Sequence, residues 1–145
     1  MKNSTDIHLS SAQQQCLSAL LDTILPASED GTMPSAGEMN FLVYLDEQAK
    51  DFMPAIVLVL DQLDENFTDA PLPARVARLE DMAKADKRAF NRLLLKIYDC
   101  YYQDDRVLMQ IGALPGPPFP RGNVVEPGDL SLLDAVVARG HGYRR

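Results

Sequence analysis

A helix-breaking proline and a helix-starting motif, both within the stretch Leu20–Tyr44, constrain the fold of this chain more than any other feature. Apolar residues recur before Pro26 at steps of three and four, which predicts an α-helix with one buried face. The ring of Pro26 pushes Leu25 out of the helical region, so this helix must end there. Ser35 followed by Glu38 has the spacing of a capping box and predicts that a second helix begins here. The apolar face of that second helix is expected to begin with Met39, Leu42 and Val43.

The chain up to Gly112 repeats this pattern of capped, amphipathic helices. The first helix is expected to begin at Ser10 or Ser11, because each serine has a glutamine three residues later. The stretch 55–60 also fits a buried strand on its own, but its helical continuation to Leu63 decides against that. A third helix is expected to start at Met53, with Pro54 in its first turn. A fourth, opened by Pro71 and Pro73, carries Val76, Leu79 and Met82. A fifth runs through Phe90–Tyr101, and a short sixth runs from its cap Asp104 to Ile111. The sequence therefore predicts an all-α, single-domain helical bundle of five to seven helices.

The pattern changes near the C-terminus. Residues 113–128 hold five of the ten prolines of the chain, which excludes a regular helix, and we expect a proline-rich arm there. The C-terminal segment 129–145 is expected to form one more short helix within Asp129–Arg139. With residues 1–9 as a flexible N-terminus, all 145 residues are assigned to a single helical domain.

The composition limits the classes of partner. The net charge is −7 and the pI is about 4.7, which argues against binding to nucleic acid or to anionic lipid. No apolar run is long enough for a membrane-spanning helix, so direct membrane insertion is not expected. The N-terminal residues MKNSTDIHLSSAQQQ carry no visible secretory signal, which favours the cytoplasm. A periplasmic location is expected instead if the chain is exported with a partner or if an export segment was removed.

Residues suited to catalysis or metal binding are sparse. The two cysteines, Cys16 and Cys100, are too few to form a metal cage. Each is expected to behave as a small buried hydrophobe. A disulfide between them is the alternative, if their two helices cross there. The only histidines, His8 and His141, lie near the chain ends. Glu-x-x-His pairs, a dinucleotide fingerprint and a Cys-x-x-Cys-His motif are all missing from the sequence. We therefore expect no catalytic, metal-binding or cofactor-binding residue in this chain. The acidic residues expected mostly on solvated faces are Asp46, Glu47, Asp61, Asp64, Glu65, Glu80 and Asp81.

Two groups of apolar residues have both a structural and a functional interpretation. Tyr98, Tyr101 and Tyr102 are spaced to share one side of a helix, either at the rim of the core or on a partner surface. In the proline-rich arm, apolar residues such as Leu114 and Phe119 are expected to pack down, either on the chain's own bundle or on another protein. The predicted partner interface accordingly includes Tyr98, Tyr102, Leu114 and Phe119.

Three motifs in order resemble the gluconate 2-dehydrogenase subunit 3 family. The first is Leu21–Ala27, similar to a recurrent element in which aspartate and threonine precede two apolar residues and a proline. The second is the spacing from there to Ala36-Gly37 and the apolar helix after it. The third is Tyr101–Val107, followed by Ile111-Gly112 and by Pro115–Pro117. The segments Leu130–Asp134 and Arg139-Gly140 also resemble the family, but more weakly than the three motifs do.

This resemblance implies an all-helical, cofactor-free small subunit. Members of the family bind a large FAD-containing dehydrogenase subunit of the glucose-methanol-choline type, and a cytochrome c subunit often completes the complex. Many members carry a twin-arginine export signal, and this sequence departs from the family by showing none. The resemblance thus implies an accessory subunit that stabilises an FAD-dependent sugar or sugar-acid dehydrogenase, with FAD in the partner.

Two other functions are weighed against this one. A homo-oligomeric helical module without a dehydrogenase partner has the same kind of sequence, and the isolated chain is in any case expected to expose an apolar patch or to self-associate through it. A stand-alone enzyme with an acidic pocket would require carboxylates that converge in a cleft with perturbed pKa values.

Overall fold

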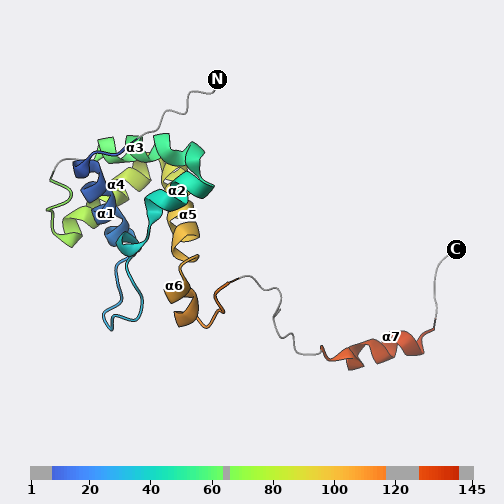
Figure 1. Ribbon diagram of the computed structural model, residues 1–145. Coiled ribbons are helices and arrows are strands. Elements are labelled where there is room, and N and C mark those ends of the chain that lie inside the picture. The colour runs from blue at the N-terminus through green and yellow to red at the C-terminus, as the bar shows by residue number, and fades with distance from the viewer. Residues whose placement is uncertain (1–7, 64–65, 117–127, 141–145) are drawn as a thin grey trace, which may run out of the picture. The chain divides into compact units, whose positions relative to one another are not determined.

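The computed structural model of the chain describes residues 8–63, 66–116 and 128–140. Within these ranges the chain forms seven α-helices and three 3₁₀ turns, and no β-strand (Figure 1). The all-α class and the expected five to seven helices are therefore confirmed. The chain divides into two compact units, residues 1–115 and 116–145, which are described separately here. The division lies within the segment 113–128 that was predicted as a proline-rich arm.

Helix α1 (Ser11–Ile24) begins and ends where the sequence predicts. Ser10 is its N-cap, and its hydroxyl accepts from the amide of Gln13 while the Gln13 side chain accepts from the Ser10 amide. These two bonds form the predicted capping box. At the other end, Leu25 has left the helical region before Pro26. The helix buries the face that carries Leu17, Leu20 and Leu21.

The helix predicted to begin at Ser35 is interrupted. Ser35 is followed by a 3₁₀ turn, η1 (Ala36–Glu38), and Met39 then has an extended backbone. Helix α2 (Phe41–Gln48) begins only after this break. The expected apolar face is wrong for Val43, which is 52% exposed, because the shifted start turns Phe41, Tyr44 and Leu45 toward the core instead.

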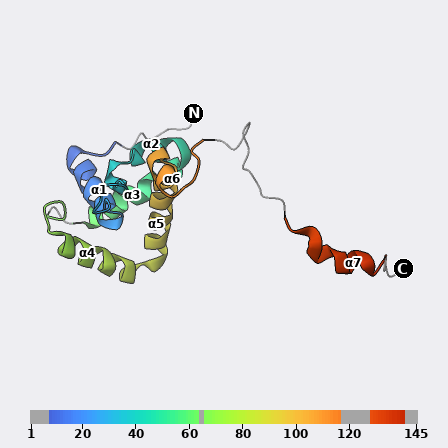
Figure 2. The ribbon, with the colours of Figure 1, turned by 90° about the horizontal axis from the view of Figure 1, so that it is seen from below.

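Three longer helices follow a short 3₁₀ turn, η2 (Lys50–Phe52). Helix α3 (Met53–Gln62) has Pro54 in its first turn and buries Ile56 and Leu60, so the helical interpretation of stretch 55–60 is confirmed. Helices α4 (Leu72–Ala85) and α5 (Lys87–Tyr101) meet at Asp86, which ends the first and caps the second through the amide of Ala89. Figure 2 shows these two helices as the arms of a corner.

Helix α6 (Asp105–Gln110) completes the first unit. Asp104 caps it through the amide of Arg106, as predicted. At its end the amide of Ala113 donates to the Leu108 carbonyl and that of Gly112 to the Met109 carbonyl. This pairing with a left-handed glycine, φ 78° at Gly112, is a Schellman motif, which anchors the chain beyond the helix.

The core of the first unit draws on nearly all of its helices. Helix α1 contacts η1, α3 and α4, while α5 contacts α2 and α4. The largest side chains that are fully buried are Leu20, Leu45, Ile56, Leu93, Ile97 and Val107. Because these residues come from five different helices, the unit is held by tertiary packing rather than by helix propensity.

The second unit is smaller. A 3₁₀ turn, η3 (Leu130–Leu133), leads into helix α7 (Asp134–Ala138), so the short helix predicted within Asp129–Arg139 forms as two consecutive turns of different type. Asp129 caps η3 through the amide of Ser131. None of the described side chains of α7 is buried. In the described parts of the chain, no helix is long and apolar enough to cross a bilayer.

Candidate functional site

The predicted interface residues that the structure describes lie at the surface of the first unit. Tyr98 is 38% exposed on α5, Tyr102 is 49% exposed at the C-cap of α5, and Leu114 is 82% exposed after α6. The rings of Tyr98 and Tyr102 lie 6.5 Å apart and are tilted to each other. Phe119 lies outside the described residues. The two tyrosines thus form one exposed aromatic pair, with Leu114 farther along the chain.

Tyr101 differs from its two neighbours. Only 4% of it is exposed, and its hydroxyl donates to the Pro34 carbonyl at 2.8 Å. Burial raises the pKa of the Tyr101 hydroxyl. The three rings do lie near one another, but the expectation that Tyr101 lies at the rim of the core or on a partner surface is wrong, because its side chain is buried. The four-residue step from Ile97 to Tyr101 was the better signal, because it continues the buried face of α5.

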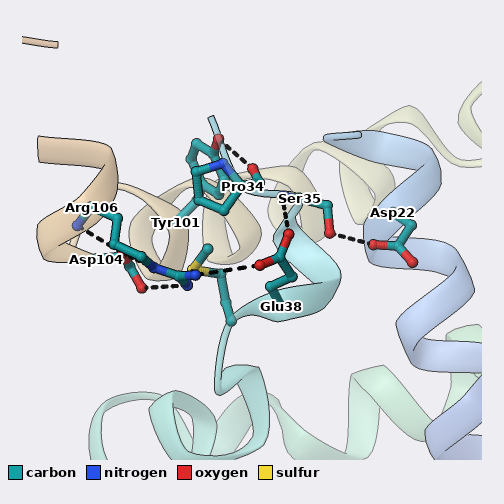
Figure 3. Close-up of polar contacts among 8 residues, drawn as sticks. Asp22, Pro34, Ser35, Glu38, Tyr101, Asp104 and Arg106 are labelled. Atoms are coloured by element: carbon teal, nitrogen blue, oxygen red, sulfur yellow. Dashed lines mark hydrogen bonds and ion pairs between the residues drawn. The ribbon is translucent and has the colours of Figure 1, made fainter. Parts of the chain in front are cut away.

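The Pro34 carbonyl belongs to a polar junction that joins the segment 34–38 to α1, α5 and α6 (Figure 3). On the α1 side, the Ser35 hydroxyl donates to Asp22 Oδ1 at 2.6 Å. Gly37 lies against the same carboxylate so closely that a Cβ at this position would overlap it. The Asp22 carboxylate therefore occupies the space that only a glycine leaves.

On the α6 side of the junction, Arg106 links two carboxylates. Its guanidinium contacts Glu38 Oε2 at 3.3 Å and Asp104 Oδ1 at 3.0 Å (Figure 3). The other oxygen of Glu38 accepts from the amide of Ser35 at 3.1 Å. Hydrogen bonding from Arg106 lowers the pKa of the Asp104 carboxyl. Glu38 therefore connects the cap of η1 to the start of α6.

The junction brings together residues from the three ordered motifs described in the sequence. Asp22 comes from the first motif, Gly37 from the second, and Tyr101, Asp104 and Arg106 from the third. Sequence reasoning identified these segments but did not find that they meet. The only feature of the sequence that pointed to their contact was that the three segments occur together and in order. In the structure these residues hold backbone segments to one another.

A separate, open groove lies between α1, α4 and α5, with a volume of about 240 Å³. Ile24 contributes from α1, Val76 and Ala83 from α4, and Leu94 and Tyr98 from α5. Glu80 is the one acidic residue among those that line it. The groove is thus mostly apolar, and it reaches the predicted interface residue Tyr98.

The two cysteines are thiols and do not form a disulfide. Cys16 is half-buried in α1, whereas Cys100 is buried in α5. Burial, with a smaller effect from the charge of Asp104, raises the pKa of the Cys100 thiol to about 11. A thiol with such a high pKa is a poor nucleophile at neutral pH, which agrees with the expected role of Cys100 as a small hydrophobe.

The acidic residues expected on solvated faces are exposed wherever the structure describes them: Asp46, Glu47, Asp61, Glu80 and Asp81. Across residues 8–63, 66–116 and 128–140, no three histidine, cysteine or carboxylate side chains are grouped so that they could hold a metal ion. His8 is exposed, and His141 lies outside the described residues.

Comparison with known proteins adds no relative. No family model, no curated protein and no solved structure matches this chain.

Proposed function

We propose that this chain is a non-catalytic small subunit that binds and stabilises the large subunit of an FAD-dependent sugar or sugar-acid dehydrogenase. The three ordered motifs supply the identity of the partner, through the family that they resemble. The observation that carries the binding role is a concentration of exposed apolar side chains at the C-terminal end of the first unit. FAD and the chemistry would belong to the partner, and a cytochrome c subunit would complete the complex.

The exposed side chains extend from the end of α5 to the residues after α6. Five large side chains between residues 98 and 114 are at least 38% exposed: Tyr98, Tyr102, Met109, Ile111 and Leu114. Tyrosine and methionine are enriched at protein interfaces, because they combine large contact area with a polar tip or an adaptable shape. Leaving so many of them in water is unfavourable unless another surface covers them.

The elements that carry these side chains are held in place. The junction attaches α5 and α6 to the segment 34–38, and the Schellman motif holds the chain at Gly112. A preorganised surface loses less conformational entropy on binding than a mobile one. Such a surface would favour the folded state of the partner by mass action, without any reaction of its own.

The test is purification of the tagged full chain from its native cells, followed by flavin absorbance and mass of the copurified protein. We expect one flavin-containing partner of much larger mass in stoichiometric amount. The double variant Tyr98→Ala/Tyr102→Ala should lose this partner. Leu58→Ala, which removes a leucine 63% exposed on α3, is the matched control and should retain it.

Recovery of the chain without flavoprotein, from cells shown to express a neighbouring flavoprotein gene, would contradict the proposal. Sedimentation of that flavin-free sample would then decide between a homo-oligomer and a monomer.

A further inference from the structure

The charge of the chain is unevenly distributed. Residues 72–98, which span α4 and nearly all of α5, contain seven cations and three anions, a net charge of +4 in a chain whose total is −7. The first 71 residues contain two cations and twelve anions, a net charge of −10. The corner formed by α4 and α5 is thus a basic region on an acidic protein, and it attracts negative charge while the rest of the chain repels it.

The apolar groove lies in this same corner. Its α4 side is formed by Val76, Leu79 and Ala83 together with the acidic Glu80, and its α5 side by Phe90, Leu94 and Tyr98. Val76 and Tyr98 are 39% and 38% exposed. The residues on each helix are spaced by three or four, so each side of the groove is a continuous strip of one helix face. Two such strips form the kind of groove that receives the apolar face of a third helix.

Two cations, Lys87 and Arg88, lie at the start of α5, next to the point where α4 ends. Lys87 precedes Phe90 by three residues and Leu94 by seven, which places it in line with the α5 strip. Lys87 and Arg88 are exposed and form no ion pair with any described residue. Lys84 pairs with Asp81 at 3.5 Å, but both side chains are more than two-thirds exposed, so that pair is weak and easily exchanged.

We infer that the groove between α1, α4 and α5 docks an amphipathic helix of the partner protein, whose apolar face is flanked by glutamate or aspartate. The inference rests on the proposed function, because it presumes a protein partner, and it adds the place of docking and the chemistry of the docked segment. Apolar side chains of that helix occupy the groove beside Val76 and Leu94. Its carboxylates meet Lys87 and Arg88 at the corner.

The complementary charges favour this occupant over the alternatives. An acidic partner is repelled by most of the surface of this chain, and the corner is where attraction can direct it. The groove supplies affinity through burial of apolar surface, and the cations supply orientation and speed of association. Binding should therefore weaken as ionic strength rises, because exposed charges are screened.

The test uses the isotopically labelled full chain and two synthetic helical peptides as long as α5, 15 residues. Both peptides have leucine at the helical spacing of one apolar face, and they differ in having glutamate or lysine beside it. We expect the acidic peptide to shift the NMR signals of groove residues and to bind about tenfold more tightly than the basic peptide. Lys87→Glu and Arg88→Glu should each remove most of that preference. Lys50→Glu, the same charge change on another part of the unit, should leave it intact.

Four results would overturn the inference. In the first, neither peptide binds, or the two bind equally. In the second, the acidic peptide shifts signals on another face. In the third, groove signals shift with protein concentration alone, which would assign the groove to a second copy of the chain. In the fourth, vesicles of anionic phospholipid shift the same signals and displace the acidic peptide, which would assign the face to a membrane surface.

The peptide experiment and the flavin purification fail independently. A chain that prefers the acidic peptide but brings down no flavoprotein keeps the docking site and loses the dehydrogenase partner. A chain that brings down the flavoprotein but shows no peptide preference keeps its function and loses this site. In that second case, the Lys87→Glu and Lys50→Glu variants should recover equal amounts of flavoprotein, which would show that the groove is not the docking site.

Discussion

Helix α5 has two faces of similar composition and opposite environment. Its inner face carries Leu93, Ile97 and Tyr101, which are at most 4% exposed. Its outer face carries Leu95, Tyr98 and Tyr102, which are 61%, 38% and 49% exposed. Leucine and tyrosine occur on both faces, so residue type does not separate them. Position in the helical repeat decides which residue stabilises the fold and which is available to a partner.

The residues of the sequence motifs and the residues proposed to meet a partner lie largely in different places. The motif residues Asp22, Gly37 and Asp104 lie in the polar junction, which the inner face of α5 joins through Tyr101. The residues proposed to meet a partner lie on the outer face or beyond it. The residues that build the junction therefore maintain the scaffold, whereas two other motif residues, Tyr102 and Ile111, are exposed on the surface proposed to meet a partner.

The largest expected difference between the faces is in the two leucines of α5. Leu93→Ala should lower the free energy of unfolding by about 2–5 kcal/mol, because it leaves a cavity in a close-packed core. Leu95→Ala should change it by about 0.5 kcal/mol or less, as expected for an exposed side chain. Urea denaturation of the two variants measures both values. Equal losses would show that the outer face is packed in solution.

Gly37→Ala tests the close contact at the junction. The added Cβ overlaps the Asp22 carboxylate, and we expect a loss of about 1–3 kcal/mol, typical of overpacking. The control is the same substitution in an Asp22→Ala background, where the overlapping group is gone. There Gly37→Ala should cost distinctly less, and the difference is the coupling energy. Identical costs in the two backgrounds would refute the contact.

Tyr101→Phe and Tyr102→Phe compare the hydroxyls of two consecutive tyrosines, one buried and one exposed. Loss of the Tyr101 hydroxyl removes the donor to the Pro34 carbonyl and should destabilise the chain by about 1–2 kcal/mol. Loss of the exposed Tyr102 hydroxyl should have an effect within about 0.5 kcal/mol. Thermal or urea unfolding of the pair measures both. A larger effect from Tyr102 would reverse the assignment of faces.

Asp104→Asn should have a smaller effect than the junction variants Gly37→Ala and Tyr101→Phe, and one that depends on pH. Arg106 lowers the pKa of Asp104 in the folded chain below its ordinary value of 3.8. The charged carboxylate therefore stabilises the fold fully above that ordinary value, and its contribution is lost as pH falls through the lowered folded-state pKa.

Asparagine still caps α6, so at neutral pH the expected loss is about 0.5–1 kcal/mol from the weakened link to Arg106. Unfolding measured from neutral to strongly acidic pH should show the difference from the native chain shrinking below the ordinary pKa. Glu47→Gln, which removes an exposed charge on α2, should show no such convergence. A difference that stays constant with pH would rule out the carboxylate as its source.

Local signals predicted most of the helices and their ends. The capping box at Ser10, the ring of Pro26, the cap Asp104 and the glycine at 112 each act within a few residues, so they can be recognised without the fold. The capping box predicted at Ser35 is present, but it caps a 3₁₀ turn instead of the predicted α-helix. The Ser35 hydroxyl is bonded to Asp22, thirteen residues away, and the α-helix begins only after Met39.

The sequence by itself determined the helical class and most of the helix boundaries, because periodicity, caps and prolines act over single turns. It did not determine that three distant motifs meet at one junction, or that the Tyr101 hydroxyl donates to the Pro34 carbonyl. Nor did it show that the basic residues of α4 and α5 share a corner with an apolar groove. Those outcomes depend on which helices pack together. Packing is decided by the burial of apolar surface summed over the whole unit, which no local stretch of sequence specifies.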